Sequence, residues 1–144
     1  MNAVFADTFY WIAFTNVQDN AHEGVKAFTR AAKPEVIFTT EEVLTEYLNY
    51  FAAWGSHFRR KAALNIQNML DNRTVRIVAQ TPDSFRSGFE LYRARLDKGY
   101  SLTDCISMQT MRSEGLSDVL TNDVHFEQEG FRAVLREPRQ VNRD

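Results

Sequence analysis

Four carboxylates stand where parallel strands and the helices after them would bring them together. Asp7 and Asp123 each come just after a short apolar run with the character of a strand. Asp104 lies in the first turn of one predicted helix, and Glu46 lies one or two turns into another. Ligands of open α/β sheets bind at the carboxyl ends of the strands, beside a topological switch point. The sequence therefore predicts that these acids converge at one edge of a sheet.

Such a cluster would be a site for divalent cations. Carboxylates a few ångströms apart raise each other's pKa, so four of them stay charged only when cations lie among them. Their hard oxygen atoms select Mg²⁺ or Mn²⁺. Two ions suit the hydrolysis of a phosphodiester, because one activates water and the other stabilises the leaving oxygen. The predicted metal ligands, which are also the predicted catalytic residues, are Asp7, Glu46, Asp104 and Asp123.

Each acid also has a structural alternative. An aspartate just after a strand or in the first turn of a helix caps free N–H groups and complements the helix dipole. The segment 101–104 (SLTD) resembles a capping box with aspartate in place of glutamate. Glu46 is equally compatible with a solvated helix face. Position by position, capping is the commoner role, and the convergence of all four acids on one sheet edge is what favours the metal site.

Three neighbouring polar residues are predicted to support the acids. Thr8 is placed to hold a metal-bound water or a phosphate oxygen, or else is an ordinary first-turn helix residue. Thr121 either hydrogen-bonds to one of the acids or is simply a β-branched strand residue. Asn49, three residues after Glu46, is predicted to orient that glutamate.

Histidine and cysteine are predicted to take structural roles. The chain has three histidines, too few for a His-rich zinc site, and His125 is interpreted as structural. The single cysteine, Cys105, is interpreted as a small buried side chain and not as a nucleophile. Two basic clusters are compatible with an RNA backbone, although solvated helix faces are favoured: Arg59, Arg60 and Lys61, and Arg93, Arg95 and Lys98. Four large aromatics either mark a face for a partner or belong to the core: Trp11, Phe51, Trp54 and Phe58.

Short apolar strands alternate with helical segments along the chain. Strands are expected at residues 2–6, 36–38, 75–78, 118–121 and 133–135. Helices are expected at residues 8–15, 20–32, 40–55, 57–70, 81–97, 101–115 and 122–129. Because the strand cores are apolar, the sheet should be mainly parallel and covered by helices on both faces. The predicted fold is a single doubly wound α/β/α domain of four to five strands, formed by residues 1–135 and followed by a polar tail at residues 136–144.

Composition limits the class of protein. A chain of 144 residues, 44% of them hydrophobic, has the length and the core of one domain. No apolar stretch approaches the roughly 20 residues that span a bilayer, and the first residues lack the basic region of a signal peptide. With one cysteine, no intrachain disulfide can form, and a cytoplasmic location is expected. The net charge of −2 gives no signature of the strongly basic kind of nucleic-acid-binding protein.

Four segments each carry one of the acids: residues 4–13 (VFADTFYWIA), 39–49 (TTEEVLTEYLN), 100–105 (YSLTDC) and 120–126 (LTNDVHF). Together and in this order they resemble the PIN domain, and most closely the VapC type of toxin ribonuclease. Asn122 departs from the pattern, because an apolar or aromatic residue often precedes the fourth acid. The resemblance implies a doubly wound fold, dependence on Mg²⁺ or Mn²⁺, and hydrolysis of RNA. It also implies homodimers and, for the toxin branch, a small antitoxin partner that blocks the site.

The leading hypothesis is therefore a metal-dependent endoribonuclease that is the toxin of a toxin–antitoxin pair. One alternative is a non-toxin PIN nuclease that acts on other RNA or on DNA. The other is a non-catalytic binding module, in which the acids merely cap helices. A nuclease needs the four carboxylates within a few ångströms of a common point, and a binding module does not.

Overall fold

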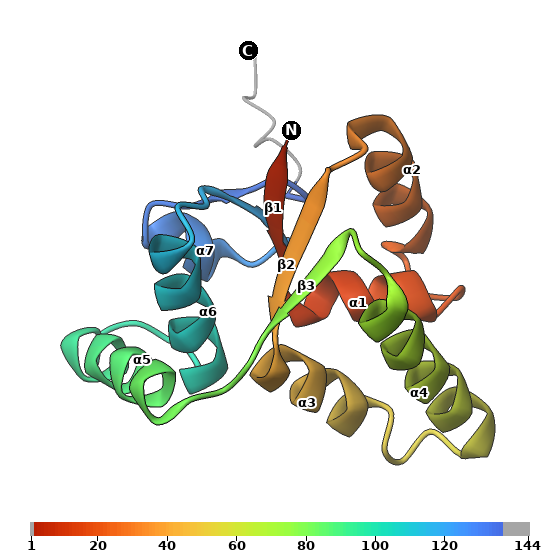
Figure 1. Cartoon of the computed structure of the whole chain (residues 1–144), viewed down its shortest axis with the longest axis horizontal. Helices are drawn as coiled ribbons and strands as arrows, with labels where there is room; N and C mark the ends of the chain where they lie inside the picture. Colours follow the sequence, from red (N-terminus) through yellow and green to blue (C-terminus); the bar gives the residue numbers. More distant parts are fainter. Residues whose placement is uncertain (1, 137–144) are drawn as a thin grey trace, which may run out of the picture.

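Five parallel strands form the sheet of the computed structural model, which describes residues 2–136 (Figure 1). The strands are β1 (Ala3–Ala6), β2 (Val36–Thr40), β3 (Val75–Val78), β4 (Asp118–Leu120) and β5 (Arg132–Ala133). Their order is β3-β2-β1-β4-β5, and every neighbouring pair is parallel. The chain builds the sheet from β1 toward one edge and then crosses to the other side of β1. The topological switch point therefore lies between β1 and β4.

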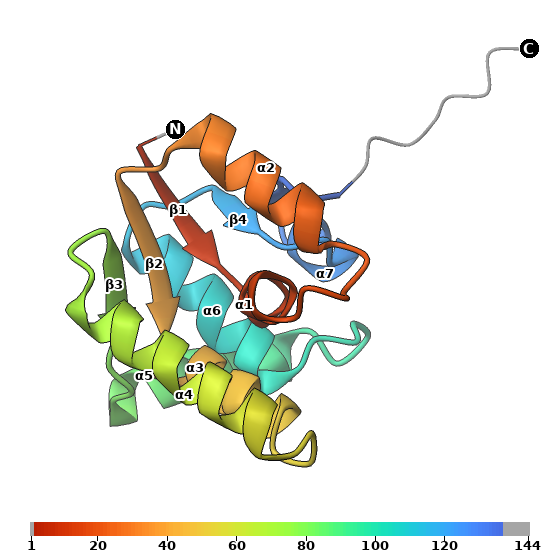
Figure 2. The same cartoon turned by 90° about the vertical axis from the view of Figure 1, so that its right-hand side faces the viewer.

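Within residues 2–136, seven helices connect the strands. They are α1 (Thr8–Thr15), α2 (His22–Ala32), α3 (Glu41–Tyr50), α4 (Ser56–Asp71), α5 (Pro82–Ala94), α6 (Leu102–Ser113) and α7 (Val124–Gln128). Helices α1, α2 and α4 lie on one side of the sheet, and α5 and α6 lie on the other (Figure 1). Figure 2 views the molecule from the side of α1, α2 and α4. The predicted doubly wound α/β/α class is confirmed, with a sheet that is parallel throughout.

Local sequence explains where these elements begin. The side chains of Val4, Phe5 and Ala6 are fully buried, as befits a central parallel strand covered on both faces. The Thr40 hydroxyl accepts a hydrogen bond from the Val43 N–H and so caps α3. Helices α5 and α6 both begin with a capping box, formed by Thr81 with Ser84 and by Ser101 with Asp104.

The large aromatics divide between the core and the surface. Trp11 and Phe51 are buried in the core. Phe58 is half-buried and stacks on Phe51, with ring centroids 5.6 Å apart. The Trp54 side chain is 41% exposed at the turn after α3. Of the four, Trp54 therefore remains the one that a partner could cover.

Several elements end earlier than the sequence predicts, among them α3, α5 and β5. Helix α3 stops at Tyr50, because the chain turns at Phe51 and sends that side chain into the core. Gly55, predicted to end this helix, instead precedes α4 with φ +87°, a conformation that favours glycine. Strand β5 has only two residues, since its neighbour β4 has only three to pair with.

The described residues also bear on two other predictions. Among residues 2–136, no helix is long and apolar enough to cross a membrane. The predicted polar tail lies outside the described residues from residue 137 onward, and the domain boundary at residue 135 stays a prediction.

Candidate active site

The switch point brings two of the predicted acids side by side. Residues of β1 pair with residues of β4, Phe5 with Val119 and Ala6 with Leu120. Asp7 and Asp123 therefore leave neighbouring strands at the same edge of the sheet, Asp7 at the start of α1 and Asp123 at the start of α7. This is the place where open α/β sheets bind ligands.

Asp7 is the most deeply buried of the four acids, with 6% of its surface exposed. Its Oδ2 accepts a hydrogen bond of 3.0 Å from the Thr121 hydroxyl. Burial, followed by the negative charge of Asp104, raises the pKa of Asp7 to about 7, and Glu46 adds to this rise. Hydrogen bonds from the Thr8 backbone and from Thr121 oppose the rise without cancelling it. This carboxyl is thus held in a place that disfavours its charged form.

Asp104 couples the other acids electrostatically. Burial raises its pKa most, hydrogen bonds from Ser101 oppose the rise, and the charges of Asp123 and Glu46 increase it. Asp104 and Glu46 in turn raise the pKa of Asp7. Each predicted ligand therefore lies close enough to at least one of the others to act on it electrostatically. Within residues 2–136, no lysine or arginine forms an ion pair with any of them.

Two of the acids also cap helices, as the structural alternative expects. Asp104 accepts a hydrogen bond of 3.0 Å from the Ser101 N–H at the start of α6. Asp123 accepts one of 2.9 Å from the His125 N–H at the start of α7. A carboxylate has two oxygens and several acceptor positions, so one capping bond leaves room for a cation. Capping and metal binding are therefore compatible at these positions.

Glu46 lies at the open side of the cluster. It is exposed and lines a hollow of about 300 Å³ together with Asn49, the residue predicted to orient it. Glu42, one helical turn earlier, lines the same hollow, and burial raises its pKa. Glu46 would therefore reach a bound ion from the solvent side, whereas Asp7 would reach it from the interior.

The two threonines differ in their partners. Thr121 bridges two acids, because its hydroxyl donates to Asp7 and accepts a hydrogen bond of 3.2 Å from the Asp123 N–H. The Thr8 hydroxyl is buried without a hydrogen-bond partner. A buried polar atom without a partner is costly unless a water or ion completes it. Four carboxylates and an unpartnered hydroxyl form an oxygen-rich donor set of the kind that Mg²⁺ and Mn²⁺ prefer.

His125 lies closer to the acids than the sequence predicts. Its Nδ1 is 3.2 Å from Asp123 Oδ1 and 3.7 Å from Asp104 Oδ2. One potential metal-ligand atom from each of these three residues lies within 4.8 Å of the other two. In the sequence, only the position of His125 two residues after Asp123 indicated that it lies near the acids. Counting the histidines excluded a His-rich zinc site but did not reveal this proximity.

Other candidate residues lie apart from this chemistry. Cys105 is buried, as predicted. Burial raises the pKa of its thiol to about 11, with smaller contributions from Asp104 and Glu129, which disfavours the thiolate. Arg93, Arg95 and Lys98 each form an ion pair with a carboxylate. The basic cluster on and after α5 is therefore paired within the chain. In the other cluster, Arg59 and Arg60 are exposed on α4.

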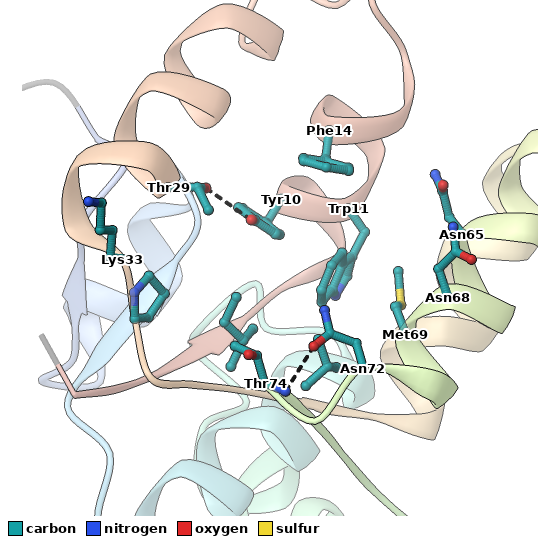
Figure 3. Close-up of a pocket in the computed structure, with 13 residues that line it drawn as sticks. Tyr10, Trp11, Phe14, Thr29, Lys33, Asn65, Asn68, Met69, Asn72 and Thr74 are labelled. Carbon is teal, nitrogen blue, oxygen red and sulfur yellow. Dashed lines mark hydrogen bonds between the residues drawn. The ribbon is translucent and has the colours of Figure 1, made fainter.

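A separate cavity of about 420 Å³ opens among α1, α2 and α4 (Figure 3). Tyr10, Trp11 and Phe14 form its aromatic wall, and amide side chains of α4 face them. Pro34 and Thr74 place it near the amino-terminal ends of β2 and β3. No aspartate or glutamate of residues 2–136 lines this cavity. It is therefore distinct from the carboxylate cluster at the other end of the sheet.

A model of the PIN-domain family matches residues 4–131, a range that includes all four acids. The chain belongs to the PIN-domain family. The 23S rRNA-specific endonuclease VapC20 of Mycobacterium tuberculosis, found in two strains, is 29% identical to this PIN domain over 134 residues. The alignment covers 93% of this chain and 99% of that protein. The resemblance to VapC-type toxins in the sequence is thereby confirmed.

Solved structures agree with the family. The crystal structure of M. tuberculosis VapC20, described as a sarcin-ricin loop cleaving toxin, superposes with a TM-score of 0.81 at 27% identity, covering 91% of this chain and 98% of that chain. VapBC2 of Rickettsia felis, bound to a DNA fragment from its promoter, superposes with a TM-score of 0.60 at 14% identity, covering 88% of this chain and 92% of that chain. The second likeness shows the fold alone.

Proposed function

We propose that this PIN domain is a divalent-metal-dependent endoribonuclease that cuts ribosomal RNA as the toxin of a toxin–antitoxin pair. The observation that carries the proposal is the group of acids around Asp7, a buried residue whose pKa is raised to about 7. No lysine or arginine among residues 2–136 forms an ion pair with these acids. The likeness to an rRNA endonuclease over nearly the full length of both chains supports the substrate class.

Each residue of the site has a distinct task in this proposal. The four carboxylates hold the ions: Asp7 and Asp104 from the interior, Asp123 from the start of α7, and Glu46 from the solvent side. Bound Mg²⁺ or Mn²⁺ would activate water and neutralise charge that develops on the phosphate. Thr121 fixes the rotamer of Asp7 through its hydrogen bond. Thr8 offers an unpartnered hydroxyl to a water or a phosphate oxygen. Asn49 lines the same hollow as Glu46 and would orient that glutamate once an ion is bound.

Cleavage of RNA tests the proposal. Purified protein would be incubated with 23S ribosomal RNA and with a mixed RNA pool, in Mg²⁺ or Mn²⁺ and in EDTA. Asp104→Asn is the test variant. Asp83→Asn is the matched control, because Asp83 is also a first-turn helix aspartate but is exposed on α5. We expect discrete cleavage by the wild type and by the control, and none in EDTA or with Asp104→Asn.

The same experiment separates the alternatives. Cleavage of the RNA pool or of DNA, with ribosomal RNA left intact, would favour a PIN nuclease that is not an rRNA-cleaving toxin. Binding of RNA without cleavage under any divalent ion would favour a non-catalytic module. Cleavage that persists with Asp104→Asn would contradict the assignment of that residue.

A homodimer belongs to the same proposal. Phe85, Phe89 and Tyr92 recur at helical spacing on α5, and each is more than 40% exposed. A contiguous aromatic face of this kind is typical of an interface between protein chains. Light scattering should therefore give twice the monomer mass for the wild type and the monomer mass for Phe89→Glu. A monomeric wild type at micromolar concentration would contradict the dimer.

The antitoxin and the cytoplasmic location are also part of the proposal. A toxin that cuts ribosomal RNA acts where ribosomes are, and the cell must keep it inhibited until it is needed. We expect co-expression with the product of an adjacent small reading frame to abolish cleavage and to relieve toxicity. Toxicity that is independent of Asp104 would contradict this role.

A further inference from the structure

The ring of His125 is held in one orientation beside the acid cluster. Tyr100 packs edge-on against it, with ring centroids 5.4 Å apart and planes at 63°. On another side, a Cβ atom at Gly99 would lie 3.2 Å from Nε2 and 3.5 Å from Cε1. The described backbone has positive φ at other glycines but not at Gly99, so the close approach to the ring is what glycine allows here. The ring therefore has little freedom to turn away from the acids.

The Nδ1 atom is aimed at the acids without forming a hydrogen bond. It is buried and has no hydrogen-bond partner, although Asp123 Oδ1 is only 3.2 Å away. A ring nitrogen that merely neutralised the acids would be expected to donate to one of them in good geometry. This buried nitrogen lies beside two carboxylate oxygens without a hydrogen bond to either. The three atoms are instead arranged as metal ligands would be, around a common point.

We propose that His125 Nδ1 is a direct ligand, together with Asp104 and Asp123, of one divalent ion of the site. The ligand atoms of these three residues all lie within 4.8 Å of one another, close enough to reach one ion. The inference rests on the proposed metal-dependent function and adds a nitrogen ligand to a site predicted from oxygen ligands alone.

The added nitrogen changes which metal the site prefers. Imidazole favours later first-row divalent ions, whereas Mg²⁺ and Ca²⁺ are held by oxygen ligands. A site made of two carboxylates and one imidazole should therefore bind Mn²⁺ in preference to Mg²⁺. Removing the imidazole should lower the affinity for Mn²⁺ far more than the affinity for Mg²⁺.

Pulsed electron paramagnetic resonance of the Mn²⁺-loaded full chain tests the ligand directly, because a bound ring nitrogen modulates the Mn²⁺ signal. We expect a nitrogen coupling in the wild type that changes when histidine is labelled with ¹⁵N. The labelling needs no substitution, so the test does not depend on a variant that folds. His125→Phe keeps an aromatic ring between Gly99 and Tyr100 and should abolish the coupling. His57→Asn, at an exposed position on α4, is the matched control and should retain it.

Metal affinities give a second readout that does not need activity. We expect His125→Phe to weaken Mn²⁺ binding by about tenfold or more and Mg²⁺ binding by less than about threefold. Gly99→Ala should weaken Mn²⁺ binding in the same direction by displacing the ring. Equal weakening of both metals, or no change for either, would overturn the proposal.

The outcomes also separate this inference from the proposed function. Stoichiometric Mn²⁺ binding and RNA cleavage without any nitrogen coupling in the wild type would overturn the role of His125 alone. It would indicate a histidine that forms an ion pair with the two aspartates. Failure of the wild type to bind either Mn²⁺ or Mg²⁺ would overturn both proposals.

Discussion

Two regions of the molecule bury carboxylates, and they do so in opposite ways. At the sheet edge, Asp7 and Asp104 face other acids, and burial followed by those charges raises the pKa of Asp7 to about 7. Behind α6, the Glu129 side chain is only 5% exposed but forms ion pairs with Arg95 and Arg112. Burial opposes ionisation there too, yet the hydrogen bonds and charges of the two arginines lower the pKa of Glu129.

The two regions differ in whether the chain supplies the counter-charge. Glu129 finds its counter-charges within the chain, where it ties the end of α7 to α6 and to the residue after α5. The acids around Asp7 find no arginine or lysine among residues 2–136. A cluster of buried like charges destabilises the fold unless a cation from outside enters it. This loss of folding free energy is expected of a site that binds metal.

The largest expected effect is on catalysis at Asp104. Asp104→Asn should lower RNA cleavage by about a hundredfold or more, because each metal contributes several kcal/mol of charge stabilisation. The amide can still accept the Ser101 N–H, so thermal stability in EDTA should stay the same or rise. Initial cleavage rates and melting curves measure the two effects.

Ser101→Ala is the control for the capping role of the same residue. It removes the hydroxyl that accepts the Asp104 N–H but keeps the carboxylate. We expect a stability loss of about 1 kcal/mol with cleavage retained. The opposite pattern in the two variants, with Asp104→Asn active but unstable, would make Asp104 a cap like any other.

The next largest effect is expected in the pH dependence of the stability of the metal-free protein. The pKa of Asp7 is raised from 3.8 to about 7 in the folded state, so the folded state holds this proton more tightly than the unfolded chain. The resulting stability is fully present below about pH 4 and is lost as the pH rises through about 7, by on the order of a few kcal/mol. Melting temperatures in EDTA should therefore fall from pH 5 to pH 8, and Asp7→Asn should flatten this trend. A metal-free protein that becomes more stable over this range would refute the uncompensated burial of Asp7.

Substitution of Glu129, the acid that is paired with two arginines, should affect stability and leave cleavage unchanged. Glu129→Gln should lower the free energy of unfolding by about 1–3 kcal/mol, because a nearly buried carboxylate loses its charge-assisted bonds to two arginines. Cleavage per folded molecule should be unchanged. Glu90→Gln, which breaks an exposed pair with Arg93, is the matched control and should cost at most about 0.5 kcal/mol. Urea unfolding measures the free energy of unfolding of both variants. Equal losses would contradict the expected difference between the buried and the exposed ion pair.

The smallest effect is expected at Thr121. Thr121→Val keeps the shape of the side chain but removes the hydroxyl that bridges Asp7 and the Asp123 N–H. Loss of such an orienting partner should lower the affinity for Mn²⁺ or the cleavage rate by about tenfold. Thr110→Val removes a buried hydroxyl that bonds only within α6 and serves as the control. Equal activity of the two variants would contradict a role for the Thr121 hydroxyl in orienting the acids.

The sequence predicted the fold well because the strands and the acids follow simple rules. Apolar runs such as residues 4–6 and 119–120 are typical of buried strands, and the carboxyl ends of parallel strands share one edge. The grouping of Asp7 with Asp123 followed from that topology. The early end of α3 could not be predicted, because it depends on where the core receives Phe51.

His125 and Glu129 show what local patterns leave out. The contacts that orient His125 come from Gly99 and Tyr100, which precede it by more than twenty residues, and no periodicity signals them. Glu129 meets Arg95 and Arg112 only after α5, α6 and α7 have packed together. Sequence spacing predicted which acids share an edge, whereas three-dimensional contacts decide which acids are compensated.

A crystal structure of the protein soaked in Mn²⁺ would show whether the carboxylate cluster binds metal, because anomalous scattering locates the ion without any assumption about activity. We expect an anomalous peak among the carboxylates of Asp7, Glu46, Asp104 and Asp123, and none at Glu129. No peak at the cluster, at Mn²⁺ concentrations that support cleavage of RNA, would contradict the proposed metal site.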